Sequence, residues 1–114
     1  MGPDLPRRLR RLPRARVLDR ELPVAASRFA RLLGLALLDR DRAGPGLLIP
    51  RCHSVHTFGM RFALDVAFLD AGGRVLAVRP AVPPRRVIWH RGAAQVAEIP
   101  AGKPNLPIPL QGDA

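Results

Sequence analysis

The chain has 114 residues, the length of one ordinary domain, and 47% of them are hydrophobic, enough to bury a core without disulfides or metals. Its richest apolar stretch, residues 29–38, contains Arg31 and is shorter than the roughly 20 apolar residues that a membrane-spanning helix needs. The single cysteine, Cys52, excludes an internal disulfide and a zinc-finger framework.

Positive charge dominates the composition. Nineteen Lys and Arg residues, eighteen of them Arg, stand against nine Asp and Glu, which gives a formal net charge of +10. This excess favours an anionic partner, either a small anionic ligand or a polyanion such as nucleic acid or an anionic surface. Aromatic residues make up only 4%, which leaves few side chains on which bases could stack. A basic solvated surface is therefore the simpler interpretation, with polyanion binding as an alternative.

Composition divides the chain into three parts. Residues 1–16 hold six arginines and three prolines and predict a basic arm that is flexible or loosely docked. They lack the continuous apolar run of a secretory signal, so we expect a cytoplasmic protein. Residues 17–103 predict a single globular domain, a monomer or a weak dimer, and residues 104–114 predict a Pro-rich tail.

A short strand and one helix are the first elements expected after the arm. Residues 17–22 can form an edge strand, which Pro23 stops. Ser27 can cap a helix over residues 27–38, where apolar residues recur at helical spacing, although Gly34 weakens it by about 1 kcal/mol. The glycines and proline of residues 42–46 predict a turn.

From residue 47 onward the apolar period changes from helical to alternating. We expect strands over residues 47–49, 62–69, 74–78, 86–89 and 94–99. Residues 70–73 supply the glycines of a hairpin loop, and the prolines of residues 80–84 predict a corner. Because strands outnumber helices, the expected fold class is mainly β (α+β): a small antiparallel sheet or half-closed barrel with one short helix packed on it.

The segment at residues 52–60 concentrates the reactive side chains, and three interpretations of it stay open. Cys52, His53 and His56 are of the types that bind zinc, but neighbouring residues of a strand point to opposite faces. Cys52 and His56 could form a nucleophile and base, but on a straight strand they are about 13 Å apart. In the third interpretation, the thiol packs as a small hydrophobe and the histidines bond to backbone.

Two carboxylates interrupt apolar strands. An unpaired carboxylate is costly to bury, so Asp65 should pair with an arginine such as Arg61, or accept a hydrogen bond from His56 or Thr57. The same argument applies to Glu98, and a second carboxylate facing Asp65 would be of particular interest.

The central run resembles a known family. Its sequence is RCHSVHTFGMRFALDVAFLD at residues 51–70, and it is flanked by SRFARLLGL at 27–35, RGA at 91–93 and EIPAG at 98–102. These segments resemble the family called domain of unknown function 192, over about residues 17–103, except that members usually have Pro where this chain has Ala63. The resemblance implies a compact, mostly β domain and no established activity, cofactor or substrate. Many members carry a secretion signal or lipid anchor, which residues 1–16 do not resemble.

We expect a small soluble binding or accessory domain rather than an enzyme, with no cofactor and no metal. Its shallow polar cleft would be formed by His56, Thr57, Met60, Arg61, Asp65 and Glu98. The alternative is an enzyme in which His56 is a general base oriented by Asp65. Side chains of these two residues within hydrogen-bond reach in an open pocket would favour the enzyme.

Overall fold

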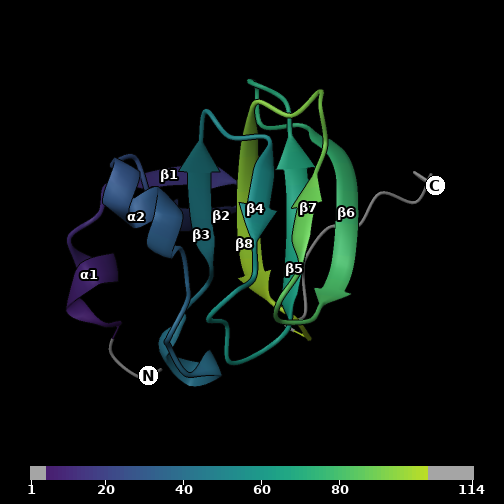
Figure 1. The fold of residues 1–114 in the computed structure, drawn as a ribbon. Helices are drawn as coiled ribbons and strands as arrows, with labels where there is room; N and C mark the ends of the chain where they lie inside the picture. The colour runs from purple at the N-terminus through teal and green to yellow at the C-terminus, as the bar shows by residue number, and fades with distance from the viewer. Residues whose placement is uncertain (1–4, 103–114) are drawn as a thin grey trace.

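A four-stranded antiparallel sheet lies at the centre of the computed structural model, which describes residues 5–102 (Figure 1). In spatial order, its strands are β3 (Leu47–Pro50), β8 (Gln95–Pro100), β5 (Leu64–Leu69) and β6 (Val75–Val82). Every residue of β5 is buried, because β8 and β6 flank it and both faces of the sheet are covered. In β8, Glu98 lies opposite Leu47 of β3 and Val66 of β5.

Two smaller antiparallel sheets cover the faces of the central sheet (Figure 1). They are β4 (Ser54–His56) paired with β7 (Val87–Trp89), and β1 (Arg14–Val17) paired with β2 (Arg20–Pro23). On one face, Val55 of β4 shares a hydrophobic cluster with Phe68 of β5. On the other face, Leu22 of β2 shares a second cluster with Leu69 of β5. The predicted mainly β class is confirmed, with separate sheets and no closed barrel in the part of the chain described.

Helices are short. They are α1 (Arg7–Arg10), α2 (Arg28–Leu33) and the 3₁₀ helix η1 (Arg40–Arg42). Among residues 5–102, no helix has both the length and the apolar character that crossing a membrane would require.

Helix α2 begins where predicted and ends five residues early. The Ser27 hydroxyl accepts a hydrogen bond from the Ala30 N–H at 3.0 Å, so the predicted N-cap is confirmed. At Gly34 the backbone adopts φ +53° and ψ −130°, a conformation that only glycine takes readily, and the helix stops. The chain then folds back, and Leu35 and Ala36 are buried in the core instead of extending the helix.

The segment expected to be a flexible or loosely docked arm lies against the core from residue 5 onward. Leu9 of α1 is buried within the hydrophobic cluster that contains Phe68. The guanidinium of Arg8 donates from Nη2 to the Gly34 carbonyl at 3.2 Å. This part of the arm is therefore attached through both apolar packing and a hydrogen bond to the end of α2.

A hairpin replaces the single strand expected over residues 17–22. Leu18 and Asp19 have left-handed φ values of +53° and +59° and turn the chain between β1 and β2. Asp tolerates this conformation, but Leu rarely adopts it, so the sequence carries no turn signal of the usual Gly or Asn type. Pairing of the two short strands and burial of Leu22 stabilise the turn.

Strand β6 continues through Pro80, where a corner was expected over residues 80–84. The expectation rests on the fact that proline has no N–H to donate to a sheet. β6 is, however, an edge strand of the central sheet. An N–H on its outer side has no partner in the sheet, so a proline at such a position removes no hydrogen bond.

A β-bulge interrupts the pairing of β5 with β6 and involves Asp65, one of the predicted site residues. The register shifts between Leu64 and Val66, and Ala81 on β6 adopts a left-handed φ of +50°. The Asp65 carboxylate accepts the Ala81 N–H at 2.8 Å through Oδ1. Asp65 is thus a largely buried carboxylate that holds a strained backbone segment, and its hydrogen bond comes from backbone rather than from His56 or Thr57.

Asp65→Asn is expected to lower the free energy of unfolding by about 1 kcal/mol, and Asp65→Ala by about 2–3 kcal/mol. The amide oxygen of Asn still accepts the Ala81 N–H but without the charge, whereas Ala leaves that N–H without its acceptor. Urea unfolding at neutral pH measures both changes. Asp39→Asn, at an exposed carboxylate, is the control and should change stability by less than about 0.5 kcal/mol. Superimposed unfolding curves for Asp65→Ala and the parent would contradict this role.

Candidate functional site

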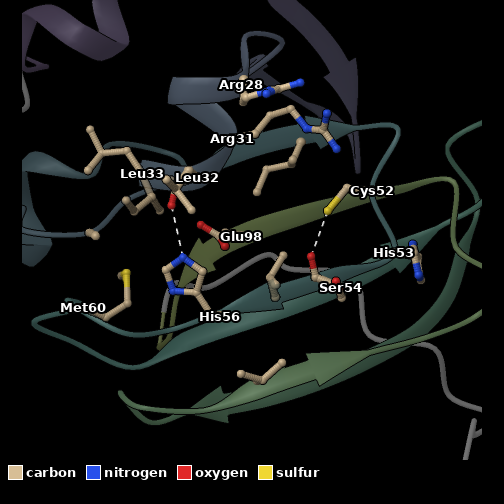
Figure 2. Close-up of a pocket in the computed structure, with 16 residues that line it drawn as sticks. Arg28, Arg31, Leu32, Leu33, Cys52, His53, Ser54, His56, Met60 and Glu98 are labelled. Atoms are coloured by element: carbon tan, nitrogen blue, oxygen red, sulfur yellow. Dashed lines mark hydrogen bonds between the residues drawn. The ribbon is translucent and has the colours of Figure 1, made fainter.

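A pocket of about 480 Å³ opens between α2, the turn that follows it, and strands β3, β4 and β8 (Figure 2). Its polar and titratable wall residues are Arg28, Arg31, Cys52, His53, Ser54, His56 and Glu98. Figure 2 shows Glu98 between the helix and β4, with the two arginines on one side of it and His56 and Met60 on the other. Apolar side chains of α2, including Leu32 and Leu33, complete the wall.

Glu98 is the most unusual residue of this pocket. Only 3% of its surface is exposed, and its Oε1 has no hydrogen-bond partner. The backbone N–H of Leu35 interacts with this carboxylate. Desolvation raises the pKa of Glu98 to about 7, against the smaller opposing effect of the Leu35 hydrogen bond. Near neutral pH this carboxyl is therefore partly protonated.

Gly34 makes room for Glu98. A Cβ built on Gly34 would lie 3.0 Å from Glu98 Oε1, closer than most real Cβ contacts. The positive φ that ends α2 also requires glycine at this position. The same residue thus ends the helix and lets the carboxylate approach the backbone.

His56 bridges β4 and α2 at one end of the pocket. Its Nδ1 accepts the Phe58 N–H at 3.2 Å, so the ring proton of the neutral side chain is on Nε2. Nε2 then donates to the Leu32 carbonyl at 3.2 Å, across the gap between strand and helix. Both ring nitrogens are engaged with backbone, as the structural interpretation of the histidines predicts.

Arg28 and Arg31 lie on consecutive turns of α2, and both line the pocket. Arg31 donates from Nη2 to the Arg51 carbonyl at 2.7 Å, which anchors its guanidinium. Its Nε is buried and has no partner. Two residues of the pocket wall, Arg31 and Glu98, thus each have a buried polar atom without a partner, and burying such an atom is costly.

The side chains of Cys52 and His53 do not interact with each other. The Cys52 thiol is half-buried and donates to the Ser54 carbonyl at 2.9 Å, while the His53 side chain is exposed. Within residues 5–102, no three His, Cys, Asp or Glu side chains gather closely enough to hold a metal ion.

Three of the six residues expected in the polar cleft line this pocket: His56, Met60 and Glu98. Thr57 is fully buried elsewhere, where its hydroxyl donates to the Pro83 carbonyl at 2.7 Å and accepts the Arg86 N–H at 2.8 Å. Arg61 forms an exposed ion pair with Asp39 at 3.1 Å rather than with Asp65. Thr57 and Arg61 thus serve to hold loops together.

The structure does not bring Asp65 together with His56 or with Glu98. On β5, Asp65 alternates with Val66, which lies opposite Glu98 in the ladder, so the two carboxylates point to opposite faces of the sheet. The Asp65 carboxylate bonds to the Ala81 N–H, and both ring nitrogens of His56 bond elsewhere. The His–Asp arrangement that would favour an enzyme is not formed.

Sequence reasoning did not include Arg28, Arg31 or Gly34 in the site. The available signal was Gly34 itself, because a glycine within a helical pattern often marks a C-cap or a close approach. A carboxylate in an apolar strand, such as Glu98, needs a neighbour of this kind. The arginines gave no signal, because arginines three residues apart on an exposed helix face are common in a chain this basic.

The molecule is thus a mainly β domain with a pocket between a short helix and the neighbouring strands, and a buried carboxyl group forms part of the pocket wall. The chain belongs to the family called domain of unknown function 192, described as an uncharacterized ACR, whose model matches residues 12–105. The resemblance found in the sequence is therefore confirmed. Among curated proteins, no sequence matches this one.

Two crystal structures have a similar fold. One is a protein from Sinorhizobium meliloti 1021, provisionally described as a transcription regulator, with 22% identity and a TM-score of 0.61 over 72% of this chain and 69% of that chain. The other is a protein of unknown function from Novosphingobium aromaticivorans DSM 12444, with 18% identity and a TM-score of 0.58 over 72% of this chain and 65% of that chain. At these identities the likeness concerns the fold alone.

Proposed function

We propose that this protein is a binding domain for a small organic anion, which it holds in the pocket between α2 and β4. The observation that carries the proposal is Glu98, a buried carboxyl group with an unpartnered Oε1 inside a pocket of about 480 Å³. Pockets of this size, with a few unsatisfied polar groups among apolar walls, are typical of small-molecule sites.

The charge of the pocket favours an anion over a cation. Arg28 and Arg31 line it, and the whole chain carries a net charge of +10. When Glu98 is neutral, a proton on Oε1 has no acceptor among the described residues, because Oε1 makes no hydrogen bond. Oε1–H and the Nε–H of Arg31 are then two unpartnered donors on residues that line one pocket, and a carboxylate or phosphate would supply the acceptors that they lack.

Binding is proposed rather than catalysis because the reactive side chains of the pocket are already engaged. Both nitrogens of His56 bond to backbone, and the Cys52 thiol donates to a carbonyl. Neither has a second side chain positioned to activate it. An accessory or sensing role for the bound anion is consistent with this arrangement.

Titration of ¹⁵N-labelled protein with small carboxylates, sulfonates and their neutral amides tests the proposal by NMR. Anions should shift the Gly34 amide resonance, and their affinity should fall by up to about tenfold per pH unit above pH 7, as Glu98 loses its proton. Glu98→Gln keeps a donor and should bind without this pH dependence. Glu98→Leu removes the donor and should weaken binding at every pH.

Two arginine variants form the matched pair for this titration. Arg28→Gln should weaken anion binding by about five- to tenfold, since a charge-assisted contact contributes about 1–1.5 kcal/mol at a partly exposed site. Arg79→Gln removes the same charge from the exposed edge strand β6, outside the pocket, and should leave affinity unchanged. Equal losses in both variants, or preferential binding of ammonium compounds, would contradict the proposal.

A further inference from the structure

A second, apolar hollow lies beside the anion pocket and shares part of its wall. It has a volume of about 340 Å³ and is lined by Leu32, Leu33, Ala36, Leu37, His56, Phe58 and Gly59. Four of these residues also line the anion pocket: Leu32, Leu33, Ala36 and His56. The two hollows are therefore neighbours that meet at His56 and the end of α2. We call the second hollow the apolar groove.

Three large apolar side chains of the groove face solvent. Leu32, Leu37 and Phe58 are 67%, 58% and 51% exposed. Single exposed apolar residues are common on protein surfaces, but a contiguous set beside a pocket indicates a binding surface. Nothing else in residues 5–102 covers these side chains.

Backbone hydrogen bonds hold this set in place. Leu37 has a left-handed φ of +67°, and its N–H bonds to the Gly59 carbonyl at 2.9 Å. The Phe58 N–H bonds to His56 Nδ1, and the two rings lie 6.0 Å apart. Leu is rarely found at positive φ, so a strained segment is kept where it presents Leu37 outward.

We propose that the ligand is an amphiphile, an aliphatic carboxylate whose chain lies in the apolar groove. This inference rests on the proposed function, because the anionic head would occupy the pocket of Glu98 and Arg31. The chain would leave that pocket past His56 and Leu32, two of the four residues that the two hollows share. Chain burial then covers the apolar side chains that the protein leaves exposed.

The size of the exposed set favours a ligand chain over a second copy of the protein. A stable dimer buries roughly 800 Å² on each partner, far more than three half-exposed side chains offer. A narrow aliphatic chain needs only such a strip. The groove also shares wall residues with a charged pocket, which gives the chain a fixed end that a general protein contact would not require.

A series of straight-chain carboxylates from acetate to decanoate, kept below micelle-forming concentrations, tests the inference. Each methylene that enters the groove should raise affinity by about fourfold. The NMR signals report the position of the chain: the Gly34 amide should shift with every member, and the Gly59 amide only with the longer ones. Neutral alkyl amides of the same lengths control for non-specific apolar binding.

Substitutions of the exposed apolar residues of the groove provide a second test of the inference. Leu37→Ser and Phe58→Ser should flatten the dependence of affinity on chain length and leave acetate binding unaltered. Leu76→Ser, at an exposed apolar residue of β6 away from the groove, should keep the full dependence.

The outcomes separate the two proposals. If acetate and decanoate bind equally, with both depending on Glu98, the amphiphile is excluded and the anion site remains. If no carboxylate binds, both proposals fail. If analytical ultracentrifugation instead shows that Leu37→Ser converts a dimer into a monomer, the exposed residues of the apolar groove form an interface between two copies of the protein. The amphiphile inference is then overturned.

Discussion

Raising the pH from about 4.5 to about 8 should lower the free energy of unfolding by about 3 kcal/mol through Glu98 alone. Burial raises the pKa of this carboxyl from 4.5 to about 7 in the folded protein. Between these two values the folded state holds a proton that the unfolded chain has released, so stability falls as pH rises. Above pH 7 both states are ionised and this contribution levels off.

The difference between Glu98→Gln and the parent protein isolates this effect. Urea unfolding at several pH values should show the variant gaining about 3 kcal/mol relative to the parent between pH 4.5 and pH 8. Glu21→Gln makes the same chemical change at an exposed position on β2 and serves as the control. Parallel pH profiles for Glu98→Gln and the parent would mean that Glu98 titrates normally and is not desolvated.

Gly34→Ala should destabilise the protein by about 2–3 kcal/mol, more than glycine-to-alanine changes usually do. An alanine there must adopt φ +53° with ψ −130°, and its Cβ would meet Glu98 Oε1 at 3.0 Å. Gly73→Ala is a matched control, because Gly73 also has a positive φ, +89°, but no atom lies within 4 Å of the point that an alanine Cβ would occupy.

A double-mutant cycle separates the two causes. In a Glu98→Ala background the contact with the carboxylate is absent, so Gly34→Ala should cost about 1 kcal/mol less than in the parent, while the backbone strain remains. Additive losses would show that the cost comes from the backbone alone. A loss in Gly34→Ala no larger than that in Gly73→Ala would contradict the close packing of Gly34 on Glu98.

Alternation of apolar residues was sufficient to predict most of the sheet. The strands β3, β5 and β8 lie within a residue or two of their predicted bounds, and the hairpin loop at residues 70–73 forms as expected. The misassigned segments depend on tertiary context. Leu18 turns the chain because the paired strands and core hold it there, and Pro80 remains in a strand because that strand is at an edge.

The candidate site was predicted only in part, because its composition also depends on tertiary structure. Glu98 was singled out because a carboxylate stood in an apolar strand, and it does line a pocket. Asp65 was singled out by the same logic, but its side chain holds a bulge on the other face. Which face each carboxylate occupies depends on the pairing register of β5 with β8, and the residues of these strands are about 30 positions apart in the sequence.

The outer edge of β6 is poorly suited to pairing with a strand of another molecule. An edge strand with a regular row of free N–H groups can recruit a strand from another molecule and begin a fibril. Here Pro80 has no N–H, and the N–H of the next residue, Ala81, is turned inward onto Asp65. Pro80 thus interrupts the outer row of N–H donors, the register shift beside it makes the edge irregular, and Arg79 adds a charge. The bulge beside Asp65 thus also hinders the addition of a further strand at this edge of the sheet.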